Sequence, residues 1–322
     1  MLKYTRLCTL LLGLCILSFA SAEDCPRGDL LEPFCDVDGD LVADPPTDPS
    51  EFLDPDVLIF SYTPVEDPSV YREAWQEFLE YLSEMTGKEV QFFAVENYAA
   101  QLEALRAGRL HVAGVNTGSV PFVVNVAGFV PFALMAGPNG EFGYQMEIIV
   151  HRDSDIETLE DLRGRQLAFV SPTSNSGFKA PTALLEAEFE MLPDVDYETA
   201  FSGRHDNSIL GVFNFDYEAA AIANTVMLRM HSQGVIDMDE LRTVYTSQTF
   251  PTTAYGHLHN LEPELAANIR EAFLSFDWSG TGLEREFGLS PDEPRSQFFP
   301  ITYQEHWEVI RTIDAISGVE YR

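Results

Sequence analysis

The residues best suited to binding chemistry are Ser174, Asn175 and Ser176, three hydrogen-bond donors that stand directly before Gly177. Their hydroxyl and amide groups can donate to the oxygens of an anion. The glycine beside them lets the backbone come close to a ligand. Residues 171–181 are therefore the first candidate for an anion-binding loop.

The elements on either side of this loop favour the same interpretation. The short apolar run 166–170 predicts a buried strand, and residues 182–189 predict a helix. The first N–H groups of a helix lack internal partners and carry partial positive charge, which favours an anion. Pro181 suits the first helical turn, where a missing N–H removes no hydrogen bond. The alternative is an ordinary N-cap, because caps use the same residue types.

A second donor-rich loop, Asn-Thr-Gly-Ser at residues 116–119, lies between an apolar run at 110–115 and a predicted helix at 120–127. In open α/β sheets, ligands sit beyond the carboxyl ends of the strands. Two such loops in different halves of one chain predict the two walls of one cleft. Thr117 is accordingly a candidate ligand-binding residue.

Strands and helices alternate along most of the chain, which predicts an α/β fold. Residues 57–62, 89–94 and 110–115 predict strands, with helices at 69–85 and 98–107 between them. A strand at 144–150 would cross to a second lobe of the same design. We expect a two-lobed, type II periplasmic-binding-protein fold, in which each lobe is an open, mostly parallel sheet flanked by helices.

The expected lobe boundaries follow from the two crossings. Residues 57–145 form the first part of lobe 1, and 146–248 form lobe 2. Residues 249–322 contain the return crossing and amphipathic helices that pack back onto lobe 1. Strands in the second lobe are expected at residues 166–170, 199–201, 217–223 and 242–246, and the C-terminal helices at 263–273 and 306–316.

The N-terminus has the pattern of a secretory signal peptide. Two basic residues precede an apolar run at 7–19, and the small residues 20–22 provide a cleavage site. We expect residues 1–22 to be removed after Ala22, which leaves a soluble periplasmic protein. Four cysteines are present, and two leave with this peptide. The remaining pair, Cys25 and Cys35, would form a disulfide in an oxidising compartment.

Residues 23–56 are rich in acidic residues and proline and predict an extended arm. Alternating carboxylates around a glycine resemble the first half of a calcium loop. The glutamate expected at the twelfth position is replaced by Thr47, so an acidic, solvated linker is the favoured alternative. The candidate ligands for structural calcium are Asp36, Asp38, Asp40 and Asp44. We expect no other cofactor.

The formal net charge is −33, and Lys3, Lys88 and Lys179 are the three lysines. Nucleic-acid binding needs a basic surface, so the composition excludes it. An acidic surface repels anions at long range, although salt screens the effect beyond about 10 Å. An anion site in this chain must therefore work through short, directed donors.

From about residue 58 to residue 253, the chain resembles the periplasmic solute-binding proteins of phosphonate, phosphite and phosphate ABC importers. The family's Ser-Thr-Ser-Gly loop corresponds to Ser174-Asn-Ser-Gly177, and its Asp-Tyr-Ala helix start corresponds to Asn97-Tyr-Ala99. Its Gly-Tyr pair corresponds to Gly143-Tyr144, and its Gly-x-His motif corresponds to Gly203-Arg-His205. Its Ser-x-x-x-Pro segment corresponds to Ser247-Gln-Thr-Phe-Pro251. The resemblance implies a monomeric receptor without enzymatic activity that closes over a phosphorus oxyanion and delivers it to a membrane permease.

The resemblance assigns oxyanion contacts to the serine loop, to Tyr98 and Tyr144 from lobe 1, and to His205 from lobe 2. Without it, the tyrosines read as core aromatics and His205 as a helix cap. With the second donor loop and the return crossing included, the candidate ligand-binding residues are Tyr98, Thr117, Tyr144, Ser174, Asn175, Ser176, His205 and Thr253.

The sequence departs from the family pattern where an ammonium group would bind. Members that take up aminoalkyl phosphonates carry a glutamate after an Asn-Thr pair, and here Val226 follows Asn224-Thr225. This disfavours 2-aminoethylphosphonate, unless Glu147 or Asp206 reaches the cleft.

Two other interpretations stay open. One is a secreted hydrolase that uses Ser176, His205 and Asp206, although no Gly-x-Ser-x-Gly elbow is present. The other is a receptor of the same fold that serves a sensor.

Overall fold

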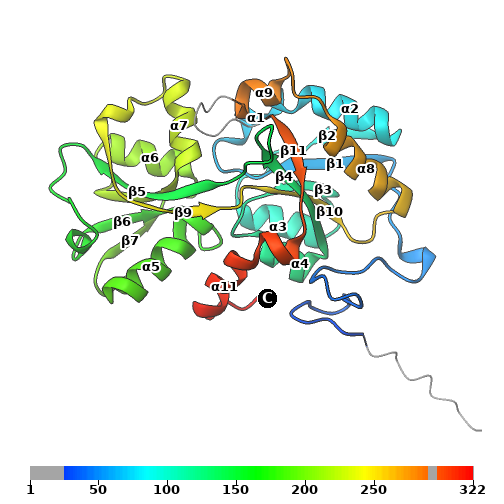
Figure 1. Ribbon diagram of the computed structural model, residues 1–322, viewed down its shortest axis with the longest axis horizontal. Helices are drawn as coiled ribbons and strands as arrows, with labels where there is room; N and C mark the ends of the chain where they lie inside the picture. Colours follow the sequence, from blue (N-terminus) through cyan, green and yellow to red (C-terminus); the bar gives the residue numbers. More distant parts are fainter. Residues whose placement is uncertain (1–24, 289–295, 322) are drawn as a thin grey trace, which may run out of the picture.

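The structure is a computed structural model that describes residues 25–288 and 296–321. The expected signal peptide, residues 1–22, lies outside the described residues. Two lobes lie side by side, and each is built on its own sheet (Figure 1). The strand order is β11-β4-β10-β3-β1-β2 in the first sheet and β7-β6-β8-β5-β9 in the second. The two-lobed α/β architecture is as the sequence predicts.

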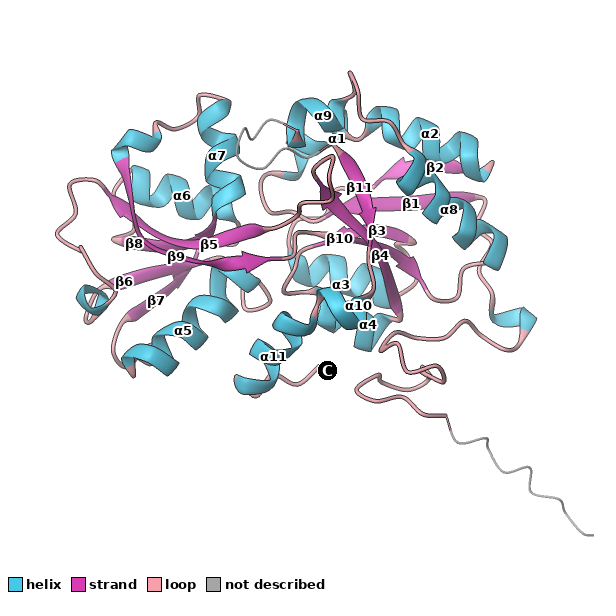
Figure 2. Ribbon diagram, in the orientation of Figure 1, coloured by secondary structure: helices cyan, strands magenta, loops and turns pink. Residues whose placement is uncertain are grey.

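Lobe 1 surrounds the six-stranded sheet. Helices α2, α8 and α9 lie above the sheet in Figure 2, and α3, α4, α10 and α11 lie below it. Its strands are β1 (Val57–Tyr62), β2 (Glu89–Phe92), β3 (Val112–Val115), β4 (Phe129–Ala136), β10 (Ala254–Leu258) and β11 (Gln297–Pro300). Its helices are α1 (Tyr71–Ala74), α2 (Gln76–Thr86), α3 (Tyr98–Arg106), α4 (Val120–Ala127), α8 (Pro263–Ser275), α9 (Gly282–Phe287), α10 (Tyr303–His306) and α11 (Glu308–Ile316).

Local sequence signals explain where the first helices begin and end. Helix α2 stops at Gly87, whose φ of 67° is left-handed and whose N–H donates to Ser83 O. Helix α3 begins at Asn97, whose side chain accepts a hydrogen bond of 2.9 Å from the N–H of Ala100. This cap fixes the first helical residue, Tyr98, beside the cleft.

Lobe 2 surrounds the five-stranded sheet, with α5 on one face and α6 and α7 on the other (Figure 1). Its strands are β5 (Tyr144–His151), β6 (Gln166–Phe169), β7 (Glu198–Phe201), β8 (Ala219–Ala223) and β9 (Leu241–Phe250). Its helices are α5 (Ala180–Phe189), α6 (His205–Phe213) and α7 (Asn224–Ser232). Strand β8 is Ala-Ala-Ala-Ile-Ala and fully buried, because helices cover both of its faces.

Both sheets are mixed, whereas the sequence suggested mostly parallel strands. In lobe 1, β1 pairs in parallel with β2 and β3, but β10 is antiparallel to β3 and β4. In lobe 2, β6 is parallel to β7 and β8, but β5 is antiparallel to β8 and β9. The antiparallel pairs involve the strands next to the crossings, because those strands carry the chain out of one lobe and back again.

The two crossings lie close together. The chain leaves lobe 1 between β4 and β5 and returns between β9 and β10. Tyr144, at the start of β5, is the register partner of Phe250, at the end of β9. Lobe 2 is therefore a continuous insertion into lobe 1. The strands of the second sheet run from Tyr144 to Phe250, between Ala136 at the end of β4 and Ala254 at the start of β10.

An aromatic cluster fills the core of lobe 1 above the sheet. The ring centroids of Phe78 and Phe273 lie 4.5 Å apart, and those of Phe273 and Phe298 lie 4.8 Å apart. Tyr255 and Trp75 extend the cluster, and both are fully buried. Because these residues come from both ends of the chain, the C-terminal segment is part of the lobe 1 core.

The N-terminal arm packs along lobe 1 and contains the disulfide between Cys25 and Cys35, with a Cα–Cα distance of 5.2 Å. Short helical turns outside the main elements are η1 (Pro49–Glu51), η2 (Pro68–Val70), η3 (Glu160–Leu162), η4 (Asn175–Lys179) and η5 (Met238–Glu240). No helix among the described residues is both long enough and apolar enough to cross a membrane.

Candidate ligand-binding site

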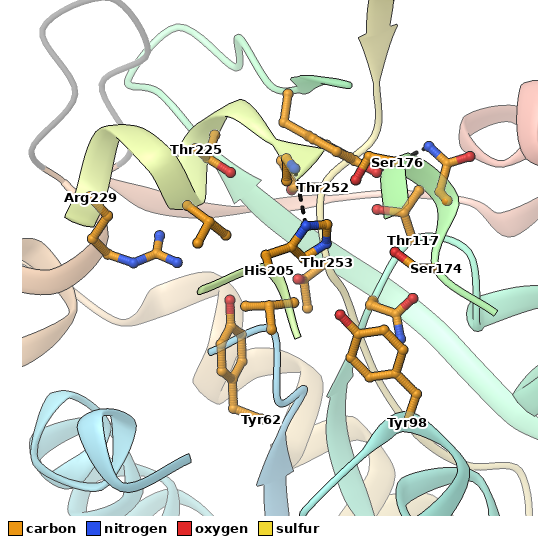
Figure 3. Close-up of a pocket in the computed structure, with 16 residues that line it drawn as sticks. Tyr62, Tyr98, Thr117, Ser174, Ser176, His205, Thr225, Arg229, Thr252 and Thr253 are labelled. Atoms are coloured by element: carbon orange, nitrogen blue, oxygen red, sulfur yellow. Dashed lines mark hydrogen bonds between the residues drawn. The ribbon is translucent and has the colours of Figure 1, made fainter. Parts of the chain in front are cut away.

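A cavity of about 50 Å³ lies between the two lobes (Figure 3). The carboxyl ends of β1, β3, β6 and β8 lead into it, as expected for an open α/β sheet. All eight residues predicted from the sequence to bind the ligand line this one cavity: Tyr98, Thr117, Tyr144, Ser174, Asn175, Ser176, His205 and Thr253.

The serine loop is both a helix cap and a wall of the cavity. Ser174 Oγ accepts a hydrogen bond of 3.1 Å from the N–H of Gly177, which is an N-cap contact. A π-helical turn, Asn175–Lys179, then continues directly into α5. The helical run therefore begins at Asn175, earlier than the predicted start at residue 182. Ser174, Asn175 and Ser176 are all buried.

Gly177 has a different role from the one expected. A Cβ atom at this position would stand 2.5 Å from Cγ2 of Val170. The glycine therefore makes room for the end of the preceding strand rather than for a ligand. This close packing fixes the turn against β6 and holds Ser176 at the cavity.

The two donor loops meet across the cleft. Ser119 Oγ donates to Thr173 Oγ1 at 2.9 Å, and Asn116 Nδ2 donates to Ser119 Oγ at 2.8 Å. Thr117 Oγ1 donates to Pro251 O at 2.8 Å, so its hydroxyl proton is already used by the return crossing. Thr117 lines the cavity, but its side chain is not a free donor.

Two buried phenols face the cavity, Tyr98 from α3 of lobe 1 and Tyr144 from the start of β5 in the sheet of lobe 2 rather than from lobe 1 as expected. The hydroxyl of Tyr98 is buried and has no hydrogen-bond partner among the described residues. The hydroxyl of Tyr144 accepts a hydrogen bond of 3.0 Å from Asn175 Nδ2 of lobe 2. Burial raises the pKa of both phenols, so both keep their protons at neutral pH. Tyr98 is therefore a donor that awaits an acceptor.

His205 is held as a neutral donor. Its Nδ1 accepts a hydrogen bond of 3.1 Å from the N–H of Ala223, which leaves the proton on Nε2. Burial, and to a lesser degree the charge of Arg229, lower the pKa of His205 to about 3. The side chain thus braces the junction of β8 and α7 instead of capping its own helix. The backbone N–H of His205 also donates to Val65 O of lobe 1 at 3.0 Å.

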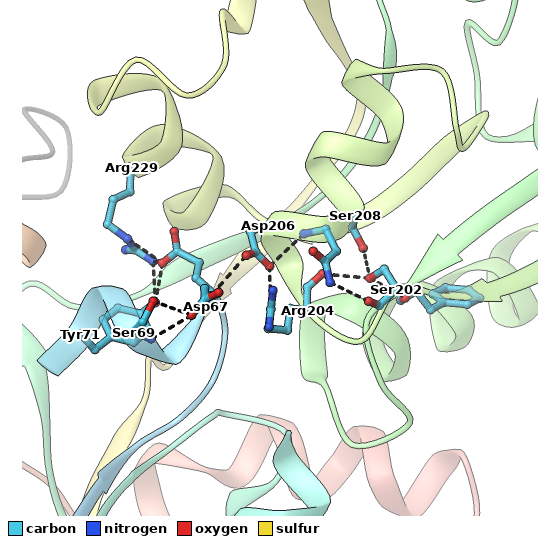
Figure 4. A network of polar contacts seen from close by, with 11 residues as sticks. Asp67, Ser69, Tyr71, Ser202, Arg204, Asp206, Ser208 and Arg229 are labelled. Carbon is cyan, nitrogen blue, oxygen red and sulfur yellow. Dashed lines mark hydrogen bonds and ion pairs between the residues drawn. The ribbon is translucent and has the colours of Figure 1, made fainter. Parts of the chain in front are cut away.

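Arg229 is the one formally charged side chain among the described residues that line the cavity. Its Nε donates to Glu66 Oε2 of lobe 1 at 2.8 Å, and Tyr71 also donates to this carboxylate (Figure 4). A second buried ion pair joins Lys179 Nζ to Asp314 Oδ1 of α11 at 2.7 Å. Each cation has a buried carboxylate partner, and the lining side chains other than Arg229 are uncharged.

Half of the lining residues were not among the predicted ligand-binding residues: Tyr62, Val65, Asn116, Ala223, Thr225, Val226, Arg229 and Thr252. Several of these residues neighbour a predicted ligand-binding residue or follow a predicted strand end, so the positions of the strand ends could have identified them. Neither Glu147 nor Asp206 lines the cavity. No carboxylate among the described residues is in place to bind an ammonium group.

The residues named for a hydrolase do not form a triad. His205 Nδ1 is bound to the backbone of Ala223, not to a carboxylate. Asp206 instead accepts from Arg204 Nε and from the N–H of Asp67, both at 3.2 Å (Figure 4). A base oriented by an acid, which this mechanism needs, is thus missing from the predicted set.

The acidic cluster of the arm is ordered by its own backbone. Carboxylate oxygens of Asp36, Asp38 and Asp40 lie within 4.8 Å of one another, while Asp44 is outside this group. Asp36 accepts hydrogen bonds from the N–H groups of Gly39 and Leu41, as in a turn that needs no ion. The calcium hypothesis stays a prediction.

The fold and the site define a class of protein. Two α/β lobes joined by two adjacent crossings, with a cavity of converging donors between them, are the architecture of a two-lobed solute-binding receptor. The sequence profile described as "ABC transporter, phosphonate, periplasmic substrate-binding protein" matches residues 60–297. The chain belongs to this family, as the resemblance in the sequence suggested.

Individual relatives agree with this assignment. The chain is 28% identical over 282 residues to the phosphate-import protein PhnD of Mycolicibacterium smegmatis, covering 83% of this chain and 85% of that one. It is 23% identical over 223 residues to the phosphonates-binding periplasmic protein of Escherichia coli, covering 68% and 66%.

Solved structures confirm the fold. A binding protein component of an ABC phosphonate transporter from Pseudomonas aeruginosa superposes with a TM-score of 0.72 at 20% identity, over 81% of this chain and 86% of that chain. PhnD1 of Prochlorococcus marinus in complex with methylphosphonate superposes with a TM-score of 0.70 at 17% identity, over 83% and 100%.

Proposed function

We propose that this protein captures a small phosphorus oxyanion without a cationic substituent, namely phosphate, phosphite or methylphosphonate, and delivers it to an ABC permease in the inner membrane. The observation that carries the proposal is the hydroxyl of Tyr98, which is buried and has no hydrogen-bond partner among the described residues, at a cavity lined by the serine loop. A buried donor without an acceptor is unfavourable, and an oxyanion relieves it.

The size of the cavity supports a ligand with few atoms. A cavity needs about 10–15 Å³ of space for the centre of a water-sized sphere to hold one water molecule. A cavity of about 50 Å³ has room for a few water-sized groups, which suits a ligand with one phosphorus atom. The names of the relatives point the same way, since one is a phosphate-import protein and one was solved with methylphosphonate.

The donors act as a set. Ser174, Ser176 and Asn175 would hold oxygens from lobe 2, together with Nε2–H of His205, and Tyr98 would close from lobe 1. Each hydrogen bond to a charged group contributes about 1.5–3 kcal/mol. No step requires a nucleophile or a bond to break, so we propose a receptor without catalytic activity.

Calorimetry with phosphate, phosphite, methylphosphonate and 2-aminoethylphosphonate tests this proposal. We expect binding of at least one of the first three, and weaker binding of the last. The double variant Ser174→Ala/Ser176→Ala should lose affinity by about tenfold or more. Absence of binding heat and of thermal stabilisation with all four ligands at millimolar concentration would refute the function.

Four further points belong to the proposal. Cleavage after Ala22 is tested by N-terminal sequencing of protein purified from the periplasm. The monomeric state is tested by light scattering on a gel-filtration column. Turnover of p-nitrophenyl phosphate or esters, lost in Ser176→Ala, would favour the hydrolase instead. Unchanged oxyanion uptake in cells that lack the gene for this protein would favour a receptor for a sensor.

A further inference from the structure

The cavity has two chemically different ends. In Figure 3, Ser174 and Ser176 lie at one end and Arg229 lies at the other, with His205 between them. Arg229 belongs to α7, one helical turn after Thr225 and Val226, which also line the cavity. An oxyanion held by the serines would point its substituent toward Val226 and Arg229.

The guanidinium of Arg229 is fixed from behind by lobe 1. Its Nε donates to Glu66 Oε2 at 2.8 Å and lies 3.4 Å from Glu286 Oε1. The guanidinium stands 5.7 Å from the ring centroid of Phe287. The exposed fractions of the Arg229 and Glu66 side chains are only 10% and 7%, so solvent screens this pair weakly.

The order of the charges matters for the ligand. Arg229 lines the cavity, whereas Glu66 does not. A ligand substituent therefore meets the cation first and the carboxylate stands behind it. A cationic substituent would be repelled by the guanidinium and would find no acceptor of its own in the wall. Repulsion of this kind is an effective source of specificity in a buried site.

We propose that Arg229 is a specificity-determining residue that rejects phosphonates with an ammonium group, and that Glu66 is a latent ammonium acceptor masked by Arg229. The inference rests on the proposed function and deepens it, because it assigns the choice of substituent to one buried ion pair. Replacing Arg229 by an uncharged side chain of similar length should expose Glu66 to the ligand and reverse the preference.

The test compares two phosphonates of nearly equal shape, ethylphosphonate and aminomethylphosphonate, which differ by one neutral or charged terminal group. Affinities are measured by competition with methylphosphonate. The wild-type protein should prefer ethylphosphonate by about tenfold or more. Arg229→Met should shift the ratio toward aminomethylphosphonate by about tenfold or more, because Glu66 loses its partner.

Two further variants isolate the charge. The double variant Glu66→Gln/Arg229→Met lacks the same contact between the lobes and removes the Glu66 carboxylate while Glu286 remains, so the gain for aminomethylphosphonate should fall by the part that Glu66 supplies. Glu66→Gln alone leaves Arg229 with Glu286 as its remaining carboxylate partner, at 3.4 Å, and should move the ratio in the opposite direction. This variant also serves if Arg229→Met fails to fold, as judged by circular dichroism. Arg165→Met is the control, since Arg165 pairs with Asp155 and Glu218 on the surface of lobe 2.

The outcomes separate the inference from the proposed function. Wild-type protein that binds no phosphorus oxyanion overturns both. If methylphosphonate binds but the ratio of the affinities for ethylphosphonate and aminomethylphosphonate is unchanged in Arg229→Met and Glu66→Gln, the inference alone is overturned. Tight binding of aminomethylphosphonate by the wild type also overturns the inference alone. A loss of methylphosphonate affinity of about a hundredfold in both Arg229 variants would make Arg229 a direct oxyanion ligand, which also overturns it.

Discussion

Gly118 of lobe 1 lies against the backbone of Asn175 of lobe 2 with no room for a side chain between them. A Cβ atom on Gly118 would stand 2.4 Å from the backbone nitrogen of Asn175 and 2.4 Å from Thr173 O. These neighbours are backbone atoms of the serine loop, which cannot move aside without displacing the cavity wall. The approach of the two lobes therefore depends on a glycine at this position.

The variant Gly118→Ala should keep the lobes from closing fully. We expect ligand affinity to fall by about tenfold or more, because the donors of the two lobes no longer reach one ligand. The unfolding temperature without ligand should change little, since the lobes can relax apart. Small-angle scattering with saturating ligand should show a larger radius of gyration than for the wild type. A variant of unchanged affinity and size would contradict this reading of the contact.

Tyr98→Phe should separate binding from stability. The hydroxyl of Tyr98 has no partner among the described residues, so its removal should leave the free protein equally stable or more stable. Ligand affinity should fall by about ten- to a hundredfold, the value of one hydrogen bond to a charged group. Calorimetry and urea unfolding measure the two effects.

Tyr197→Phe is the matched control for this variant, since the Tyr197 hydroxyl is also buried with no partner in the part of the chain that the structure describes, but does not line the cavity. Its removal should leave affinity unchanged. Equal losses of affinity in the two variants would show that Tyr98 acts only through packing.

Lys179→Met should destabilise the protein strongly. Lys179 and Asp314 are 3% and 1% exposed, and removal of the cation leaves a buried carboxylate without its ion-pair partner. Breaking such a pair costs about 3–5 kcal/mol. The double variant Lys179→Met/Asp314→Leu should recover most of this loss, because no charge remains buried. Urea unfolding gives both values, and a loss below about 1 kcal/mol in the single variant would speak against a tight pair.

His205 should make the unliganded protein less stable in acid. Its pKa is lowered from 6.5 to about 3 in the folded state, so the unfolded chain binds the extra proton first. Stability should be unaffected by His205 above about pH 6.5 and should fall as the pH decreases toward 3. His205→Gln should reduce this slope, while buried His257, with a pKa of about 4, keeps part of it.

Nitrogen-15 NMR provides the direct measurement. The spectrum should show His205 as the neutral tautomer with its proton on Nε2 through the neutral range. A His205 imidazole that titrates near its ordinary pKa would contradict the buried geometry.

The serine loop was predictable because its information is local. A strand, a run of donors and a helix start lie within a few residues of one another, and the same short segment forms both the cap and the cavity wall. The position of Tyr98 was predictable for the same reason, because the Asn97 cap fixes the residue that follows it. Predicted residues on separate strand ends met because parallel strands bring their carboxyl ends to one edge.

Other features needed the folded structure. Strand β4 is a continuous apolar run that contains Pro131, and such a run shows neither helical nor strand periodicity. Its proline is tolerated where the register with β10 shifts at Tyr255 and Gly256. The pair of Glu66 and Arg229 joins residues 163 positions apart, so no sequence window contains both. Long-range partners of this kind are fixed only by the way the lobes meet.

The pairing of Tyr144 with Phe250 has a practical consequence for engineering. Because these register partners are the first and last paired residues of the β5–β9 pair, the whole second lobe enters and leaves at a single point. A short artificial turn at that point would reconnect the chain of lobe 1 and release lobe 2 as one uninterrupted fragment. The same point suits the splicing of a fluorescent reporter, whose signal would follow the angle between the two halves.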